Sequence, residues 1–166
     1  MSITLPLELL KEFKSDTFVE TGSFRGGGIQ KALDAGYTDI YSIEFLKWYY
    51  TECMLLFGGN PKVKLYLGNS ATKLTHLVRN IKGSITFWLD SHTDDSSPIL
   101  KELEQISKLK RKDHVIIIDD VRLFGEKKRF PKLTEILESI RNINSNYIVE
   151  YRDSLLYSGD ILVAHL

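Results

Sequence analysis

The chain has 166 residues, 43% of them hydrophobic, and its 22 Lys and Arg residues are balanced by 22 Asp and Glu residues. This length fits a single domain over residues 1–166, and zero net charge argues against a general nucleic-acid-binding protein, which needs surplus cations to neutralise phosphates. The single Cys53 excludes an internal disulfide and a zinc site built from several cysteines. Apolar stretches stay well short of the roughly 20 residues that span a membrane, and no signal peptide is evident, so we expect a cytoplasmic protein without membrane contact.

From the N-terminus onward, short β-rich runs alternate with helical patterns. Residues 1–15 predict one short helix and no substantial lid. The next predicted strands are 17–20, 39–44, 63–67 and 85–89. The helices that follow them are predicted at 29–33, 46–57, 71–81 and 98–109. Ser70 and Ser97 are the expected N-caps of the last two helices, and Pro98 is the expected first residue of the fourth.

The C-terminal third completes the pattern. Residues 114–118 are apolar after the first position, as expected for a strand buried on both faces, and Pro131 is predicted to open a helix that extends to about Ile140. Strands 147–151 and 161–164 follow with no helix between them, so at least one of the two is expected to run antiparallel. The alternation predicts an α/β fold with a mostly parallel sheet, whose ligands bind at the carboxyl ends of the strands.

A glycine-rich loop, residues 20–28, lies between the first predicted strand and its helix. Glycines at such a place let the backbone turn tightly and approach a ligand closely. Glu44 ends the next strand, at a spacing from Gly22 that suits an acid accepting both ribose hydroxyls. The loop departs from G-x-G-x-x-G because Phe24 takes the place of the second glycine. A flexible turn is the alternative, but the strand, loop, helix and acid together favour nucleotide binding.

Acidic side chains end the fourth and fifth predicted strands. Asp90 follows the fourth strand, and Asp119 and Asp120 follow the fifth. Two carboxylates about 4 Å apart repel by about 4 kcal/mol at an effective dielectric constant near 20. A cluster of three therefore needs protons, basic partners or a cation, and Mg²⁺ is a hard ion that prefers such oxygen ligands. The alternative is that Asp119 or Asp120 only caps the following turn.

These motifs resemble the class I S-adenosylmethionine-dependent methyltransferases over most of the chain, from about residue 17 onward. The resemblance rests on Glu20-x-Gly22-x-x-x-Gly26, on Glu44, and on the run from Gly68 to Ser70. It implies a Rossmann-like sheet of seven strands, mostly parallel, with an antiparallel strand near the C-terminus and helices on both faces. The cofactor-binding residues that it implies are Glu20, Gly22, Ser23, Gly26, Glu44, Phe45, Asn69, Ser70 and Asp90.

The segment Leu89-Asp90-Ser91-His92, together with residues 117–124, is similar to the metal-dependent O-methyltransferases of the catechol and macrocin types. This likeness implies that Asp90, Asp119 and Asp120 bind Mg²⁺ or another divalent cation. It also implies O-methylation of a hydroxyl on a sugar or other small molecule. Asp90 and His92 are the predicted catalytic residues. His92 is the candidate base, with an outer metal ligand and an exposed loop histidine as alternatives.

Three departures from the family leave the function open. Asn69 stands where many members carry an acid, and both the segment before the first strand and the segment between Asp120 and Pro131 are short. The site is therefore expected to be open, to accept a small molecule, a glycan or a peptide end, or to be completed by a second subunit of a homo-oligomer. A binding module that has kept the cofactor pocket but lost the chemistry is one alternative. A nicotinamide-dependent oxidoreductase is another, disfavoured by the glycine spacing and by the acidic cluster.

Overall fold

The computed structural model describes residues 4–126 and 128–166. Its strands are β1 (Thr17–Thr21), β2 (Ile40–Glu44), β3 (Val63–Leu67), β4 (Ile85–Leu89), β5 (Val115–Ile118), β6 (Ile148–Arg152) and β7 (Ile161–His165). Its helices are α1 (Leu7–Glu12), α2 (Gly27–Asp34), α3 (Lys47–Phe57), α4 (Ser70–Val78), α5 (Ile99–Ser107) and α6 (Leu133–Ile143), with a 3₁₀ turn η1 (Val121–Leu123).

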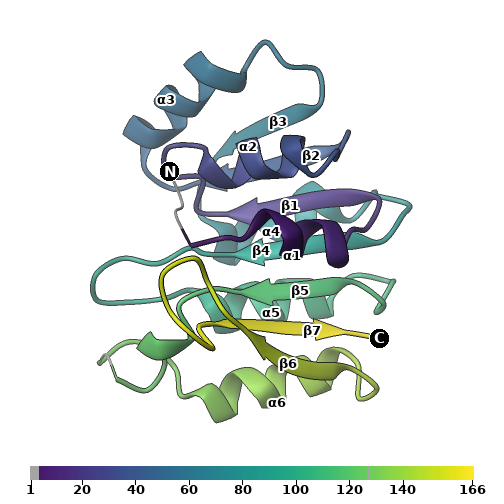
Figure 1. Cartoon of the computed structure of the whole chain (residues 1–166), viewed down its shortest axis with the longest axis vertical. Coiled ribbons are helices and arrows are strands. Elements are labelled where there is room, and N and C mark those ends of the chain that lie inside the picture. The colour runs from purple at the N-terminus through teal and green to yellow at the C-terminus, as the bar shows by residue number, and fades with distance from the viewer. Residues whose placement is uncertain (1–3, 127) are drawn as a thin grey trace.

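The strands form one sheet in the order β3-β2-β1-β4-β5-β7-β6 (Figure 1). The first five strands of this order pair in parallel, whereas β7 runs antiparallel to both β5 and β6. The predicted α/β fold, with an antiparallel strand near the C-terminus, is therefore confirmed, and β7 is that strand.

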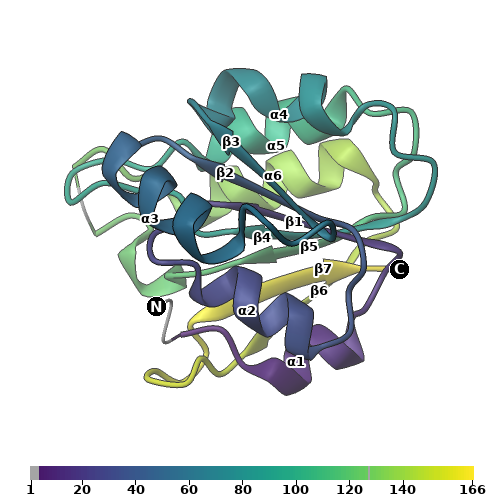
Figure 2. The ribbon, with the colours of Figure 1, turned by 90° about the horizontal axis from the view of Figure 1, so that it is seen from above.

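Helices cover both faces of the sheet, with α4, α5 and α6 on one side and α1 and α2 on the other (Figure 2). Consecutive residues of the central strands point to opposite faces and enter two separate cores. Phe87 packs among the residues of α4, α5 and α6, while Trp88 packs among those of α1, α2 and α3. Because β4 and β5 are buried on both faces, their sequences are almost wholly apolar. Within the described residues, no helix has the length and apolar character that a membrane crossing requires.

The helix starts differ from the prediction by one or two residues. Asn69, not Ser70, is the N-cap of α4, because its side-chain oxygen accepts the amide hydrogen of Ala71 at 2.9 Å. Helix α5 begins at Ile99 with Pro98 in the capping position, so Ser97 lies one residue outside the predicted cap. Helix α6 begins at Leu133, two residues after the predicted Pro131.

Strand register brings the polar loop residues to one edge. Thr21 pairs with Leu89, and Leu89 pairs with Ile118. Gly22, Asp90 and Asp119 therefore leave adjacent strands at the same level. The chain order of the strands reverses between β1 and β4, and this reversal is where ligands bind in open α/β sheets.

Candidate functional site

A pocket of about 810 Å³ opens at the carboxyl edge of the parallel strands. Of the predicted cofactor-binding residues, those that line it are Gly22, Glu44, Phe45, Asn69, Ser70 and Asp90. His92, Asp119 and Asp120 line the same pocket. The glycine loop and the acidic residues, predicted from separate motifs, thus share one cavity.

Gly22 is required by a close backbone approach between β1 and β4. Its φ is +84°, and a Cβ at this position would lie 2.5 Å from the carbonyl oxygen of Asp90. Phe24, which replaces the second glycine of the nucleotide-binding pattern, also adopts a positive φ of 47°. The loop therefore keeps a glycine-like backbone at Phe24, while the ring of Phe24 packs on Tyr49 with 4.4 Å between ring centroids.

Glu44 is buried, and backbone amides hold its carboxylate in place. One oxygen accepts the N–H of Phe24 at 2.8 Å, and the other accepts the N–H of Leu46 at 2.8 Å. Each carboxylate oxygen keeps a second lone pair for a ligand hydroxyl. Glu44 thus joins the glycine loop to the start of α3 and presents acceptors to the pocket.

Three of the predicted cofactor-binding residues, Glu20 in β1 and Ser23 and Gly26 in the loop, do not line the pocket. Glu20 accepts the hydroxyl hydrogen of Ser42 at 2.6 Å, and the Ser23 hydroxyl contacts the same Ser42 hydroxyl. Burial raises the pKa of Glu20 to about 8, with a smaller rise from Glu44 and an opposing effect from the Ser42 hydrogen bond. In this geometry Glu20 supports the loop through Ser42, and its direct contact with a cofactor stays a prediction.

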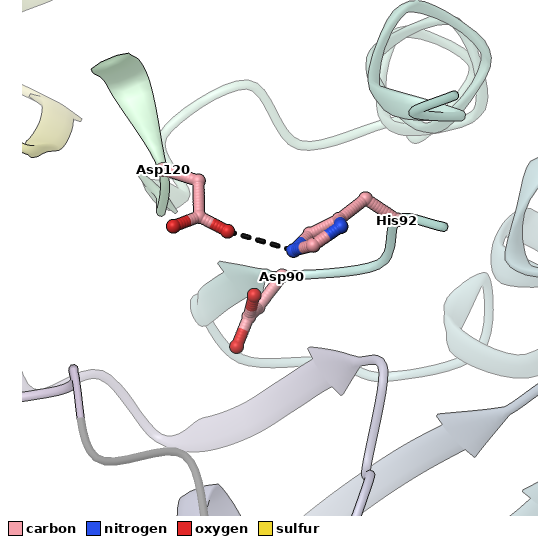
Figure 3. A group of neighbouring side chains, drawn as sticks. All are labelled: Asp90, His92 and Asp120. Carbon is pink, nitrogen blue, oxygen red and sulfur yellow. Dashed lines mark ion pairs between the residues drawn. The ribbon is translucent and has the colours of Figure 1, made fainter. Parts of the chain in front are cut away.

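Asp90, His92 and Asp120 form a cluster of side chains that could hold a metal ion (Figure 3). Asp90, His92 and Asp120 offer ligand atoms within 4.8 Å of one another, and Asp119 instead groups with Asp120 and Asp160. The side chain of Asp119 is turned aside because its Oδ2 accepts the Thr4 hydroxyl hydrogen at 2.6 Å. Asp120 follows with a left-handed φ of 58°, which directs its carboxylate toward His92. In this conformation His92, rather than Asp119, completes the group with Asp90 and Asp120, and the set of Asp90, Asp119 and Asp120 stays a prediction.

Basic partners already balance much of the charge in this cluster. His92 Nε2 lies 2.7 Å from Asp120 Oδ2, and Arg122 Nη1 lies 2.7 Å from Asp120 Oδ1. Burial raises the pKa of Asp120, but His92 and Arg122 outweigh this effect and hold the pKa below its usual value. Arg122 also pairs with the buried Asp160. The Asp120 side chain makes no capping hydrogen bond to η1, so the turn-capping alternative finds no support for this residue.

His92 lies between two oxygens. Its Nδ1 is 3.1 Å from the carbonyl oxygen of Thr93, and its Nε2 faces the carboxylate of Asp120. Both oxygens are hydrogen-bond acceptors, so this arrangement suits a ring that donates from both nitrogens. To act as a base, one His92 nitrogen would have to accept a proton rather than donate one to its neighbouring oxygen.

The donor chemistry of the cluster fits a divalent cation. Asp90 and Asp120 supply carboxylate oxygens, and His92 supplies an imidazole nitrogen. Carboxylates suit Mg²⁺ and Mn²⁺, whereas an imidazole shifts the preference toward Mn²⁺ and other transition metals. Among residues 4–126 and 128–166, a buried oxygen of Asp119, Oδ1, finds no hydrogen-bond partner.

Thr4 and Asp160 belong to this site but were missed by the sequence reasoning. Thr4 fixes Asp119, and Asp160 fixes Arg122 through both the backbone amide and the side chain of Arg122. Each lies far in the sequence from its partner. No local pattern marks either residue, so only the fold reveals these contacts.

No protein-family model and no curated protein matches the chain. Solved structures do match. The O-methyltransferase TomG from Streptomyces achromogenes, in complex with S-adenosylmethionine, is 16% identical, with a TM-score of 0.64 over 96% of this chain and 77% of TomG. An O-methyltransferase from Bacillus cereus in complex with S-adenosylhomocysteine is 15% identical, with a TM-score of 0.66 over 100% of this chain and 84% of that one. The Podospora anserina methyltransferase PaMTH1 is 14% identical, with a TM-score of 0.66 over 96% and 75%. The chain therefore has the fold of the class I S-adenosylmethionine-dependent methyltransferases, as its motifs predicted.

Proposed function

We propose that this chain is an S-adenosylmethionine-dependent methyltransferase that methylates a hydroxyl oxygen with the help of a divalent cation, Mg²⁺ or Mn²⁺. The observation that carries the proposal is the shared pocket, where a glycine loop and a buried Glu44 meet a cluster of ligand-type side chains. The fold adds support, because TomG and the Bacillus cereus enzyme hold the cofactor or its product. We expect a cytoplasmic enzyme acting on a sugar or another small molecule.

The glycine-loop side of the pocket would bind the cofactor. Glu44 retains lone pairs for the two ribose hydroxyls, and Gly22 leaves room for the ligand beside the ends of β1 and β4. Asn69 would lie near the adenine. Its side-chain oxygen already caps α4, so it keeps one lone pair to accept a hydrogen bond from the adenine amino group.

The acid-cluster side of the pocket would bind the substrate whose hydroxyl oxygen receives the methyl group. Asp90, His92 and Asp120 would hold the cation, which lowers the pKa of a bound hydroxyl and orients its oxygen. During transfer the new O–CH₃ bond forms as the S–CH₃ bond breaks, and the hydroxyl proton must leave. If Asp90 and Asp120 alone hold the cation, a neutral His92 would accept that proton on a ring nitrogen, and S-adenosylhomocysteine would leave as the other product. Arg122 keeps Asp120 ionised throughout.

Thermal unfolding with added ligands tests the cofactor assignment. S-adenosylhomocysteine at 100 times its dissociation constant should stabilise the protein by about 2.7 kcal/mol, and NAD⁺ should give no shift. Each ligand is measured with and without Mn²⁺. A shift with NAD⁺ alone, or with neither ligand, would contradict the proposal.

A cofactor-binding protein without transfer activity is the second candidate. It is favoured by one observation, the neutralisation of Asp120 by His92 and Arg122 without any cation. Binding of Mn²⁺, followed by its electron paramagnetic resonance signal, separates the two. The methyltransferase proposal expects Mn²⁺ to bind in the presence of S-adenosylhomocysteine, whereas the binding module expects none.

A further inference from the structure

A small cavity of about 10 Å³ adjoins the main pocket. It is lined by the cluster residues Asp90, His92 and Asp120, by Asp119, and by Glu102 from the first turn of α5. A space of this size accommodates about one water molecule, and water occupies such a space when two or more polar groups face it.

Two carboxylate oxygens without hydrogen-bond partners belong to residues that line this cavity. Glu102 is 1% exposed and Asp119 is 3% exposed, and neither Glu102 Oε1 nor Asp119 Oδ1 has a partner in the described part of the chain. A buried acceptor left without a donor destabilises the folded protein, because the group has lost its hydrogen bonds to water. In their ionised forms the two carboxylates only accept hydrogen bonds, so neither can satisfy the other without an added donor. A water molecule has two O–H donors and can satisfy both.

We propose that Glu102 and Asp119 hold one buried water molecule between Oε1 and Oδ1, and that Glu102 is thereby a positioning residue for the metal cluster. The water would fix the second oxygen of Asp119, whose first oxygen is held by Thr4. Asp119 immediately precedes Asp120, so a fixed Asp119 sets the direction in which Asp120 leaves β5. The metal part of this inference rests on the proposed function.

Glu102 is also tied to the cofactor side of the pocket. Burial raises its pKa to about 7, and the hydroxyls of Ser70 and Thr21 oppose that rise. Ser70 begins α4, and Thr21 ends β1 next to Gly22. A single buried side chain thus lies between the elements that present the glycine loop and the residues that present the cation ligands.

Crystal structures of three proteins test the water directly. The wild type should show one ordered water within hydrogen-bond distance of both oxygens. Glu102→Leu should lose it, whereas Glu102→Gln should retain it, because the amide oxygen still accepts a hydrogen bond. The matched control is Glu104→Leu on the same helix, where Glu104 is bound to the surface residues Lys101 and Lys108.

Calorimetric titration with Mn²⁺ tests the positioning role. Loss of an outer-shell partner typically lowers metal affinity about 10–100-fold, so Glu102→Leu should bind Mn²⁺ at least about tenfold more weakly. Glu102→Gln and Glu104→Leu should bind Mn²⁺ within about threefold of the wild type. Near wild-type Mn²⁺ affinity in Glu102→Gln, together with weaker binding in Glu102→Leu, would show that the hydrogen bond to the water matters and not only the space that the side chain fills.

The outcomes keep this inference distinct from the proposed function. A wild-type crystal without the water, or Glu102→Leu with unchanged Mn²⁺ affinity, overturns the role given to Glu102. If the wild type binds neither Mn²⁺ nor S-adenosylhomocysteine, the proposed function fails, and the positioning role falls with its metal part. The crystallographic test of the water still stands in that case.

Discussion

The pocket has two halves that are held in different ways. In the glycine-loop half, formed by Gly22, Phe24 and Glu44, backbone groups fix the acid, because both oxygens of Glu44 accept main-chain amide hydrogens. In the acid-cluster half, formed by Asp90, His92, Asp120 and Arg122, side chains hold one another through ion pairs. The glycine-loop half can bind a neutral diol without rearranging. The acid-cluster half must break at least the His92–Asp120 contact before it can bind a cation.

This difference explains why the sequence predicted the geometry of the glycine-loop half more closely than that of the acid-cluster half. A backbone-held geometry depends on glycine positions and strand ends, which are visible in a sequence. A side-chain-held geometry depends on rotamers and on distant partners such as Thr4 and Asp160. We expect the glycine-loop half to be rigid and the acid-cluster half to rearrange when a cation binds.

The largest effect is expected for Gly22→Ala, which disrupts the glycine-loop half. Alanine at a φ of +84° is strained, and its Cβ would lie 2.5 Å from the carbonyl oxygen of Asp90. Strain and overlap together should cost about 2–4 kcal/mol of unfolding free energy. S-adenosylhomocysteine affinity should fall by more than about tenfold, since the loop must move away from β4. Chemical unfolding and isothermal titration calorimetry measure the two effects.

Gly59→Ala is the matched control for this substitution. A Cβ at Gly59 would meet no atom of the described residues within 4 Å. Both its stability and its ligand affinity should remain close to those of the wild type. If Gly22→Ala behaved like this control, the loop would be flexible, and the contrast between the two halves would be wrong.

The second prediction concerns the acid-cluster half and decides between two ligand sets. The structure groups Asp90, His92 and Asp120, whereas the family resemblance implied Asp90, Asp119 and Asp120. Pulsed electron paramagnetic resonance of bound Mn²⁺ should therefore show coupling to an imidazole nitrogen. His92→Asn should abolish that coupling and weaken Mn²⁺ binding by about tenfold or more, because an imidazole ligand is lost.

His76→Asn is the control, because His76 is exposed on α4, away from the cluster residues. It should leave both the nitrogen coupling and the affinity unchanged. Bound Mn²⁺ without nitrogen coupling in the wild type would favour the carboxylate set and would mean that Asp119 rotates away from Thr4 on binding.

Most of the fold could be predicted because it depends on patterns that recur along the chain. The apolar run in β5, the Gly22 turn and the missing helix between β6 and β7 each constrain the architecture locally. Predicted helix starts were off by one or two residues, as at Asn69, because neighbouring polar residues compete for the same capping role. Sequence alone could place Asp90, Asp119 and Asp120 at one sheet edge but could not orient them. Their directions depend on the left-handed backbone of Asp120 and on a hydroxyl 115 positions away in sequence, that of Thr4.

The last prediction concerns Glu20, which supports the glycine loop through Ser42. Folding raises the pKa of Glu20 from 4.5 to about 8, so between these values the folded protein holds a proton that the unfolded chain has lost. Stability contributed by this group therefore falls as pH rises through that window, by at most about 1.4 kcal/mol per pH unit. Glu20→Gln cannot ionise, so its unfolding free energy should decline less between pH 5 and pH 8 than that of the wild type.

Urea unfolding at several pH values measures this difference, and Glu138→Gln on the exposed face of α6 is the control. Subtracting the Glu20→Gln curve from the wild-type curve removes the contributions of other groups that titrate in the same window, including Glu102 and Asp119. Parallel curves for wild type and Glu20→Gln would mean that Glu20 is ionised in the folded protein. The glycine loop would then rest on a buried charge, and this half of the pocket would depend on side-chain electrostatics as much as the acid cluster does.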